Sequence, residues 1–142
     1  MPNRGISPAI SDCTKEDLRI VKARIAELCL DDNDLEPEQF LIAKTGEEVI
    51  GFGRIRTYPG SCELCSLGVV EKFRLQGVGS LLSQALIKKS GRPLYTVTVI
   101  PEFFEKLGFR AVTEFPPEVK AKLNYCTSAL PVPETYAVMQ YF

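Results

Sequence analysis

An apolar strand that runs through a short glycine-containing loop into a helix constrains this chain more than any other feature. The strand-like segment Cys62 to Val70 precedes Arg74-Leu75-Gln76-Gly77-Val78-Gly79-Ser80, and apolar residues then recur at helical spacing from Val78. Two glycines let backbone N–H groups approach a ligand, and the start of a helix leaves several N–H groups unpaired. The loop therefore predicts an anion site, where the amides of Leu75 to Ser80, the helix dipole and Arg74 bind a pyrophosphate.

Two better-known phosphate loops do not fit this segment. The dinucleotide fingerprint GxGxxG is matched only by Gly77 and Gly79, and no Gly-Lys-Ser/Thr follows as the nucleotide-triphosphatase loop requires. Taken alone, two glycines in an ordinary strand-to-helix turn remain the alternative.

The remaining pattern predicts a single α+β (mixed α/β) domain over residues 1–142. Thr14 and Asp17 have the spacing of a capping box, which opens a helix that runs to about Leu30 and is broken at most once. The expected strands are 7–12, 40–44, 49–57, 62–70, 94–100, 109–113 and 136–142, and the later expected helices begin at Val78, Pro101 and Glu118. Strands 40–44, 49–57 and 62–70 should form three consecutive antiparallel strands.

Composition limits what such a domain can do. A net charge of -1 gives no basic field for nucleic acid, and the absence of His excludes Ser-His-Asp and Cys-His hydrolases. No signal peptide or membrane span is predicted, and the five cysteines form an odd set, so we expect a cytoplasmic protein with reduced thiols. Cys62 and Cys65 would point to opposite faces of a strand, so no metal site is predicted.

Two motifs resemble the GNAT superfamily of N-acetyltransferases. Arg74, Gly77 and Gly79 match its central motif Gln/Arg-x-x-Gly-x-Gly/Ala, and Phe103-Phe104-Glu105-Lys106-Leu107-Gly108-Phe109 is similar to its second signature, Phe-Tyr-Glu-Lys-x-Gly-Phe. The resemblance implies a mostly antiparallel twisted sheet of about six or seven strands flanked by about four helices. It also implies acetyl-CoA as the cofactor.

The same resemblance assigns roles at the cofactor site. The pyrophosphate would bind Arg74, Leu75, Gln76, Gly77, Val78, Gly79 and Ser80, and the pantetheine arm would lie along Leu67, Gly68, Val69 and Val70. An unpaired amide of that strand would polarise the thioester carbonyl. Phe104 stands beside the cofactor where the family usually has a tyrosine general acid, and because a phenyl ring donates no proton the acid is left unassigned.

Acetyl transfer also needs a base that accepts the proton of the acceptor amine. Glu63 is the first choice, because it stands on the strand before the motif where histone-type members of the family carry a glutamate base. The alternative is a solvated glutamate on an exposed strand face.

The C-terminal segment gives a narrower resemblance, to the acetyltransferase domains of bacterial N-acetylglutamate synthases. It is carried by Pro116-Pro117-Glu118-Val119-Lys120, Cys126, Pro133-Glu134-Thr135 and the strand Cys62 to Leu67. It implies a small-molecule amine as acceptor, and among such amines it favours an amino acid such as glutamate.

Arg54 and Arg56 lie two apart on one strand face, so both could hold substrate carboxylates, or both could be solvated. A polyamine, an aminoglycoside and a protein amine remain alternative acceptors, and a non-catalytic acyl-CoA sensor remains an alternative function. An exposed last strand could pair across a homodimer.

Overall fold

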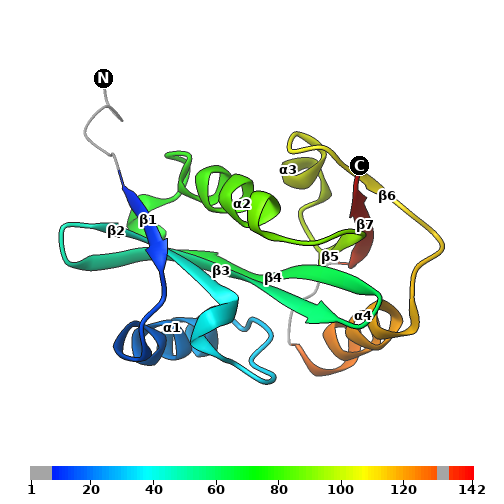
Figure 1. Cartoon of the computed structure of the whole chain (residues 1–142), viewed down its shortest axis with the longest axis horizontal. Helices are drawn as coiled ribbons and strands as arrows, with labels where there is room; N and C mark the ends of the chain where they lie inside the picture. Colours follow the sequence, from blue (N-terminus) through cyan, green and yellow to red (C-terminus); the bar gives the residue numbers. More distant parts are fainter. Residues whose placement is uncertain (1–7, 131–134) are drawn as a thin grey trace.

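The computed structural model describes residues 8–130 and 135–142, and their strands form one seven-stranded sheet (Figure 1). The strands are β1 (Ala9–Asp12), β2 (Phe40–Thr45), β3 (Glu48–Tyr58), β4 (Ser61–Val69), β5 (Leu94–Thr98), β6 (Phe109–Ala111) and β7 (Ala137–Tyr141). The helices are α1 (Lys15–Glu27), α2 (Val78–Lys89), α3 (Pro101–Glu105) and α4 (Pro117–Ala129), with short 3-10 turns η2 (Pro37–Gln39) and η3 (Glu71–Phe73). In Figure 1, α2 and α3 lie on one side of the sheet and α1 and α4 on the other. The predicted mixed α/β fold is confirmed.

The first helix begins where the sequence predicts and ends slightly earlier. The Thr14 hydroxyl accepts the Asp17 N–H at 3.0 Å and the Asp17 carboxylate accepts the Thr14 N–H at 3.1 Å, which completes the capping box. The helix is unbroken and buries Leu18, Val21 and Ile25 in a cluster with residues of β2 and β3. It ends at Glu27 because Cys29 takes a left-handed φ of 56°, and the chain then turns to Asp31.

The strand order is β1-β2-β3-β4-β5-β7-β6, and every neighbouring pair is antiparallel except β4 with β5. That parallel pair has only two register positions, Cys62 with Leu94 and Glu63 with Tyr95. Beyond them the described strands no longer pair, so the sheet opens between β4 and β5.

A β-bulge in β4 lies at the start of this opening. The register with β3 shifts between Phe52 and Arg54, and Ser66 takes a φ of 53°, unusual for a residue other than glycine. Ser66 faces the α1 and α4 side, where its hydroxyl contacts Arg54, and Leu67 then faces α2, where it approaches the position of Gly53. The bulge thus resets which side chains of β4 face each helix layer.

The C-terminal part differs from expectation in two ways. Helix α4 extends to Ala129, beyond the expected end at Tyr125, because its buried residues Val119, Lys122 and Cys126 continue one helix face. The last strand, β7, is not exposed, because β6 pairs with its outer edge. The predicted residues Ser7, Pro133 and Glu134 lie outside the described residues.

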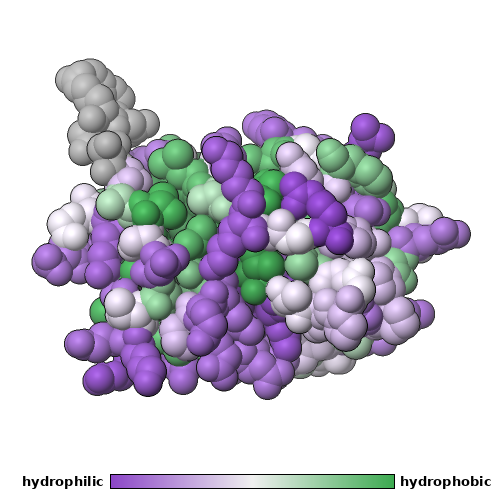
Figure 2. Space-filling model, in the orientation of Figure 1, coloured by the Kyte–Doolittle hydropathy of each residue, from purple (hydrophilic) through white to green (hydrophobic). Residues whose placement is uncertain are grey.

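The outer surface on the α1 side is polar. Figure 2 shows hydrophilic residues over α1 and the loop that follows it, at the lower edge of the view. Among residues 8–130 and 135–142, no helix is long and apolar enough to cross a membrane.

Candidate active site

A cavity of about 230 Å³ lies where β4 and β5 separate, and we call it the cleft cavity. Its walls come from the segment after α1, from β4, from β5 with the residues that follow it, and from α4. They include Leu28, Cys29, Asp31, Leu64, Cys65, Ser66, Leu67, Thr96, Val97, Thr98, Val99, Ile100, Phe104, Lys122 and Cys126. Since unpaired β4 and β5 backbone borders this space, a bound ligand can hydrogen-bond to the two strands where they no longer bond each other.

One side chain bridges the strands at the apex of the opening. The hydroxyl of buried Thr96 donates to the Leu64 carbonyl at 2.8 Å, immediately beyond the last paired residues. This bond replaces a backbone contact and marks where the cleft begins.

Replacing Thr96 by valine should therefore destabilise the fold slightly. Valine keeps the shape of threonine but leaves the buried Leu64 carbonyl with one acceptor contact fewer, which should lower the free energy of unfolding by roughly 1–3 kcal/mol. Urea denaturation measures the change, and Thr96→Ser, which keeps the hydroxyl, is the matched control. Equal stability of the valine and serine variants would contradict this role.

The loop that the sequence singles out lies between the end of β4 and the first turn of α2. Leu75 has a φ of 65° and Gly77, the N-cap of α2, a φ of 86°. The first backbone bond of the helix runs from the Leu81 N–H to the Gly77 carbonyl, and within the described chain the amides of residues 75–80 donate to no backbone carbonyl. These N–H groups therefore stand available at the positive end of a 12-residue helix.

The loop also has room for a large anion. A Cβ on Gly77 would meet no heavy atom within 4 Å, and the Leu75 side chain is 100% exposed, directed away from the protein. The Nε of Arg74 donates to the Val69 carbonyl at 2.9 Å, which holds the guanidinium beside the end of β4. The available N–H donors, the N-terminus of α2 and the open space around Gly77 all fit a diphosphate.

The other residues predicted to bind the cofactor do not all lie at the cleft cavity. Leu67 lines the cleft cavity, whereas Gly68 packs so closely that a Cβ would lie 2.7 Å from the Phe52 ring, and the Val70 N–H donates to the Ile50 carbonyl. Gly79 approaches Phe103, with 3.4 Å from its Cβ position to the ring. Phe104 lines the cleft cavity and is buried.

Phe104 is held by aromatic packing. Its ring packs edge-on against Phe103, with centroids 5.0 Å apart, and against Phe109, with centroids 5.3 Å apart. This position supplies shape and an apolar wall without a proton donor.

Glu63 is not a solvated strand residue: it is 1% exposed and its carboxylate has two protein partners. The Tyr58 hydroxyl donates to Oε1 at 3.0 Å, and the ammonium of Lys122 on α4 binds Oε2. Burial alone would lower the pKa of Lys122, but its anionic neighbours, including Glu63 and Asp31, outweigh burial and raise this pKa above its ordinary value. Lys122 therefore stays charged and fixes Glu63.

Asp31 joins the same buried network from the loop after α1. Its Oδ2 lies 3.0 Å from Lys122 Nζ and 3.6 Å from an Arg56 nitrogen, and its Oδ1 accepts the Asn33 N–H at 2.9 Å. Burial works to raise the pKa of Asp31, but the charge of Lys122 and the bond from Asn33 outweigh it and lower that pKa. An Arg54 nitrogen lies 3.6 Å from Oδ1, so Asp31 is an ionised partner of three cations at neutral pH.

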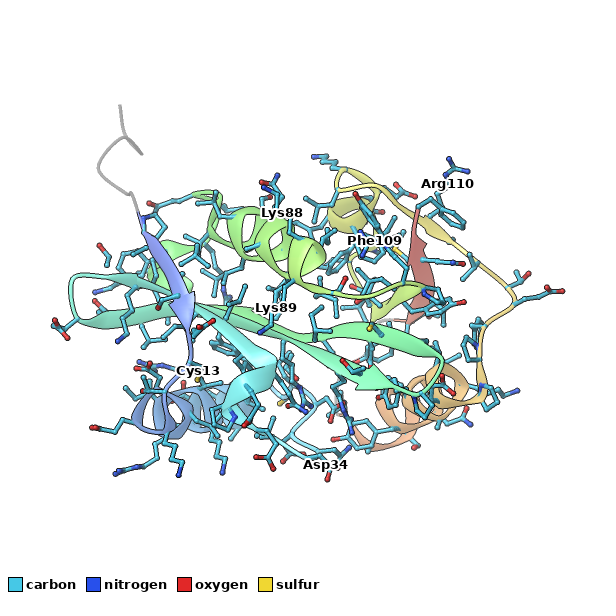
Figure 3. All side chains as sticks on the ribbon, viewed as in Figure 1. Cys13, Asp34, Lys88, Lys89, Phe109 and Arg110 are labelled. Carbon is cyan, nitrogen blue, oxygen red and sulfur yellow. The ribbon has the colours of Figure 1, made fainter. Side chains whose placement is uncertain are left out.

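The two predicted arginines have different surroundings. Arg54 is 0% exposed, and its Nε donates to Ser66 Oγ at 3.0 Å while an Nη donates to Gln39 Oε1 at 2.9 Å. Neither arginine is solvated on an open face, but Arg56 is nearer the surface, where it donates to Asp34 Oδ2 at 3.0 Å. Figure 3 shows Asp34 on the α1 and α4 side of the sheet, whereas Lys88 lies on the α2 side.

A second cavity of about 310 Å³, which we call the α4 cavity, adjoins this network. It is lined by Asp31, Asn33, Arg56, Tyr58, Glu118, Ala121, Lys122 and Tyr125. Asp31 and Lys122 line both cavities, so the apolar cleft and the polar chamber meet at these two residues.

Sequence reasoning missed Tyr58, Asp31 and Lys122 as site residues. Lys122 did carry a signal, since it lies three residues after Val119 and four before Cys126, on the apolar face of its helix. Asp31 and Tyr58 carried none, because a loop aspartate and a strand-end tyrosine are ordinary until the fold brings them to Lys122.

Comparison with known proteins agrees with this geometry. Residues 36–111 match the family model described as acetyltransferase (GNAT) domain. The fold is similar to that of N-acetylglutamate synthase from Neisseria gonorrhoeae complexed with coenzyme A and N-acetyl-glutamate, with a TM-score of 0.76 and 17% identity over 96% of this chain. This chain spans 35% of that synthase chain.

Two further solved structures cover similar lengths. Rv2747 from Mycobacterium tuberculosis, in complex with CoA and NLQ, has a TM-score of 0.76 and 15% identity over 94% of this chain and 98% of its own. The ribosomal-protein-S18-alanine N-acetyltransferase from Escherichia coli has a TM-score of 0.65 and 17% identity over 95% of this chain and 93% of its own. Because the family model matches more than half of the 142 residues, and the loop and second signature lie within the match, this chain belongs to the GNAT acetyltransferase family.

Proposed function

We propose that this protein binds acetyl-CoA in the cleft cavity and transfers the acetyl group to the amine of a small molecule held in the α4 cavity. The observation that supports this most is the position of the cleft: it opens between β5 and β4, the strand that leads into the glycine loop, and it shares Asp31 and Lys122 with the polar chamber. Acetyl-CoA supplies an acetyl group already activated as a thioester.

Some residues of the chain bind the cofactor, and others transfer the proton of the acceptor. The amides of Leu75 to Ser80 and Arg74 bind the pyrophosphate, and the β4 backbone beyond the last β5 pair offers N–H donors to a carbonyl oxygen. Phe104 and the apolar cleft walls exclude water. Glu63 acts as the base that removes the proton of the acceptor amine.

An α-amino acid, such as glutamate, is the acceptor that we propose first. Arg56 is the better partner for its carboxylate, because Arg56 lines the α4 cavity whereas Arg54 is enclosed by protein acceptors. A substrate carboxylate would replace Asp34, whose side chain is 81% exposed, as the partner of the Arg56 guanidinium.

A second acceptor class, an amine without a carboxylate, is favoured by a different observation. Both arginines and Lys122 already have protein carboxylates within 4.0 Å, from Asp31, Asp34 and Glu63. Glu118 and Asp31 also line the α4 cavity, so a polyamine, aminoglycoside or protein amine would meet anionic groups there.

The two classes, and a sensor without turnover, are separated by one pair of measurements. Calorimetry with coenzyme A tests binding, and coenzyme A release is then followed with amino acids and with their decarboxylated analogues. Turnover restricted to carboxylate-bearing amines supports the first class, and turnover of both sets supports the second. Binding without release on any amine would favour an acyl-CoA sensor over an enzyme.

Arg56→Ala should raise the KM for an α-amino acid by about 10- to 100-fold, since a hydrogen bond to a charged group is worth roughly 1.5–3 kcal/mol. The KM of the decarboxylated analogue should change much less, because that acceptor has no group for the guanidinium. Arg19→Ala on the exposed face of α1 is the control for loss of a surface arginine. An unchanged KM for every amino acid would refute the carboxylate role.

A further inference from the structure

We infer that Tyr58 is a further catalytic residue, which relays the proton of the acceptor amine from the α4 cavity to Glu63. The inference rests on the proposed function, because it assigns a path for the proton that acetyl transfer to an amine releases. The observation behind it is that the Tyr58 hydroxyl bonds Glu63 and Tyr58 lines the α4 cavity.

Glu63 cannot meet the acceptor directly. Its side chain is 1% exposed, and it does not belong to the described residues that line the cleft cavity or the α4 cavity. Lys122 occupies Oε2, so Oε1 is the oxygen left for an incoming proton, and Oε1 accepts the Tyr58 hydroxyl at 3.0 Å. Within the described chain, Tyr58 is therefore the hydrogen-bond partner of that oxygen that also lines a cavity.

The two polar side chains at which the cavities meet, Lys122 and Asp31, are poor proton acceptors. Lys122 has a raised pKa, and an ammonium has no lone pair with which to accept a proton. Asp31 has a lowered pKa and is bound by Lys122 and Arg56, so it is a weak base. Cys126 lines the cleft cavity, and burial raises the pKa of its thiol to about 11, so the thiol stays neutral.

Tyr58 has the properties of a relay. It ends β3, it is half-buried, and its ring lies 5.6 Å from the Arg56 guanidinium carbon. Burial and the neighbouring Glu63 raise the pKa of Tyr58, so the phenol is protonated at rest and cannot simply keep a second proton. It can gain one proton only as it gives up its own.

The step balances without any other reactant. As the acceptor nitrogen forms its bond to the acetyl carbon, its N–H proton passes to Tyr58 Oη while the Oη proton passes to Glu63 Oε1. The C–S bond of the thioester then breaks, and coenzyme A leaves with the electron pair as a thiolate that takes a proton from solvent. Tyrosine is unchanged and Glu63 is protonated. Glu63 returns the proton to solvent by the reverse path once product has left the α4 cavity.

The kinetic test uses Tyr58→Phe, Glu63→Gln and the double variant, with the best acceptor from the amine panel. Each single change should lower kcat by about 10²-fold, the lower range for loss of general-base catalysis. Because the two groups act in series, the double variant should be no slower than the slower single variant. Tyr141→Phe, on β7 outside both cavities, is the matched loss of a phenol hydroxyl.

A second readout does not depend on any acceptor. The chain has five tyrosines, so NMR of protein labelled at tyrosine Cζ gives five resonances, and Tyr58→Phe identifies the one from Tyr58. Glu63→Gln should shift this resonance, because the partner of the phenol changes, while Tyr141→Phe should leave it in place.

The outcomes separate the relay from the proposed function. Three results would each overturn the relay but leave acetyl transfer in place. They are a normal kcat in Tyr58→Phe, losses that multiply in the double variant, and a Tyr58 resonance that does not shift in Glu63→Gln. Absence of turnover by the wild-type protein with every amine would overturn the proposed function, and the relay with it.

Discussion

Gly77→Asp is expected to abolish measurable binding of coenzyme A. The change places a carboxylate at the N-cap of α2, among the amides of residues 75–80 that have no backbone acceptor in the described chain. The new side chain competes for these donors and repels the pyrophosphate. Loss of two hydrogen bonds to a charged group, at roughly 1.5–3 kcal/mol each, weakens binding by about 10²- to 10⁴-fold, and charge repulsion adds to this loss.

Two controls isolate charge from shape and from backbone strain. Gly77→Asn adds a side chain of the same size and tolerates the left-handed φ of 86° about as well, so it should weaken binding far less than the aspartate. Gly60→Asp adds the same charge at the β3–β4 turn, where a Cβ meets nothing within 4 Å, and should bind normally. Calorimetry measures all three, with thermal unfolding as the check on folding. If the aspartate and asparagine variants bind equally well, the loop is not the phosphate site.

This loop was predictable because its determinants are local. Gly77, Gly79 and the apolar periodicity of α2 lie within one short segment, and the capping box of α1 needs only Thr14 and Asp17. The alternation and turns of β2, β3 and β4 are equally local, so the order of strands and helices followed from the sequence.

The proton-transfer side of the site depends on contacts between distant segments. Lys122 meets Glu63 across 59 residues, and Arg54 meets the Asp31 carbonyl across 23. The spacing of apolar residues along the sequence does not predict contacts between segments so far apart in the chain. The bulge at Ser66 was not predictable for a related reason. A non-glycine residue with a φ of 53° is strained, and here the bonds of its hydroxyl to Arg54 and to the Asp31 carbonyl offset the strain. Both partners are distant in the sequence.

Lys122→Met should remove much of the stability of the fold at neutral pH. Methionine fills a similar volume, but the change leaves the buried carboxylates of Asp31 and Glu63 without the cation that both contact. Breaking a buried ion pair on one side costs roughly 3–5 kcal/mol, so we expect urea unfolding to show a loss of that size at pH 7. Lys120→Met, an exposed neighbour on the same helix, should change stability by less than about 0.5 kcal/mol.

The pH dependence of that loss distinguishes a missing charge from poor packing. In the wild-type protein the lowered pKa of Asp31 gives stability that is complete above its ordinary value, about 3.9, and is lost as pH falls through the lower native value. The raised pKa of Lys122 gives stability that is complete below about 10.4 and is lost as pH rises through the higher native value. Between these limits Asp31 and Lys122 are both charged in the wild-type protein. Without Lys122 the two buried carboxylates repel, so proton uptake stabilises the variant, and its deficit should shrink as pH falls from 8 to 5. A deficit that stays constant over this range would show that Lys122 contributes packing alone, and the carboxylates would then need no shared cation.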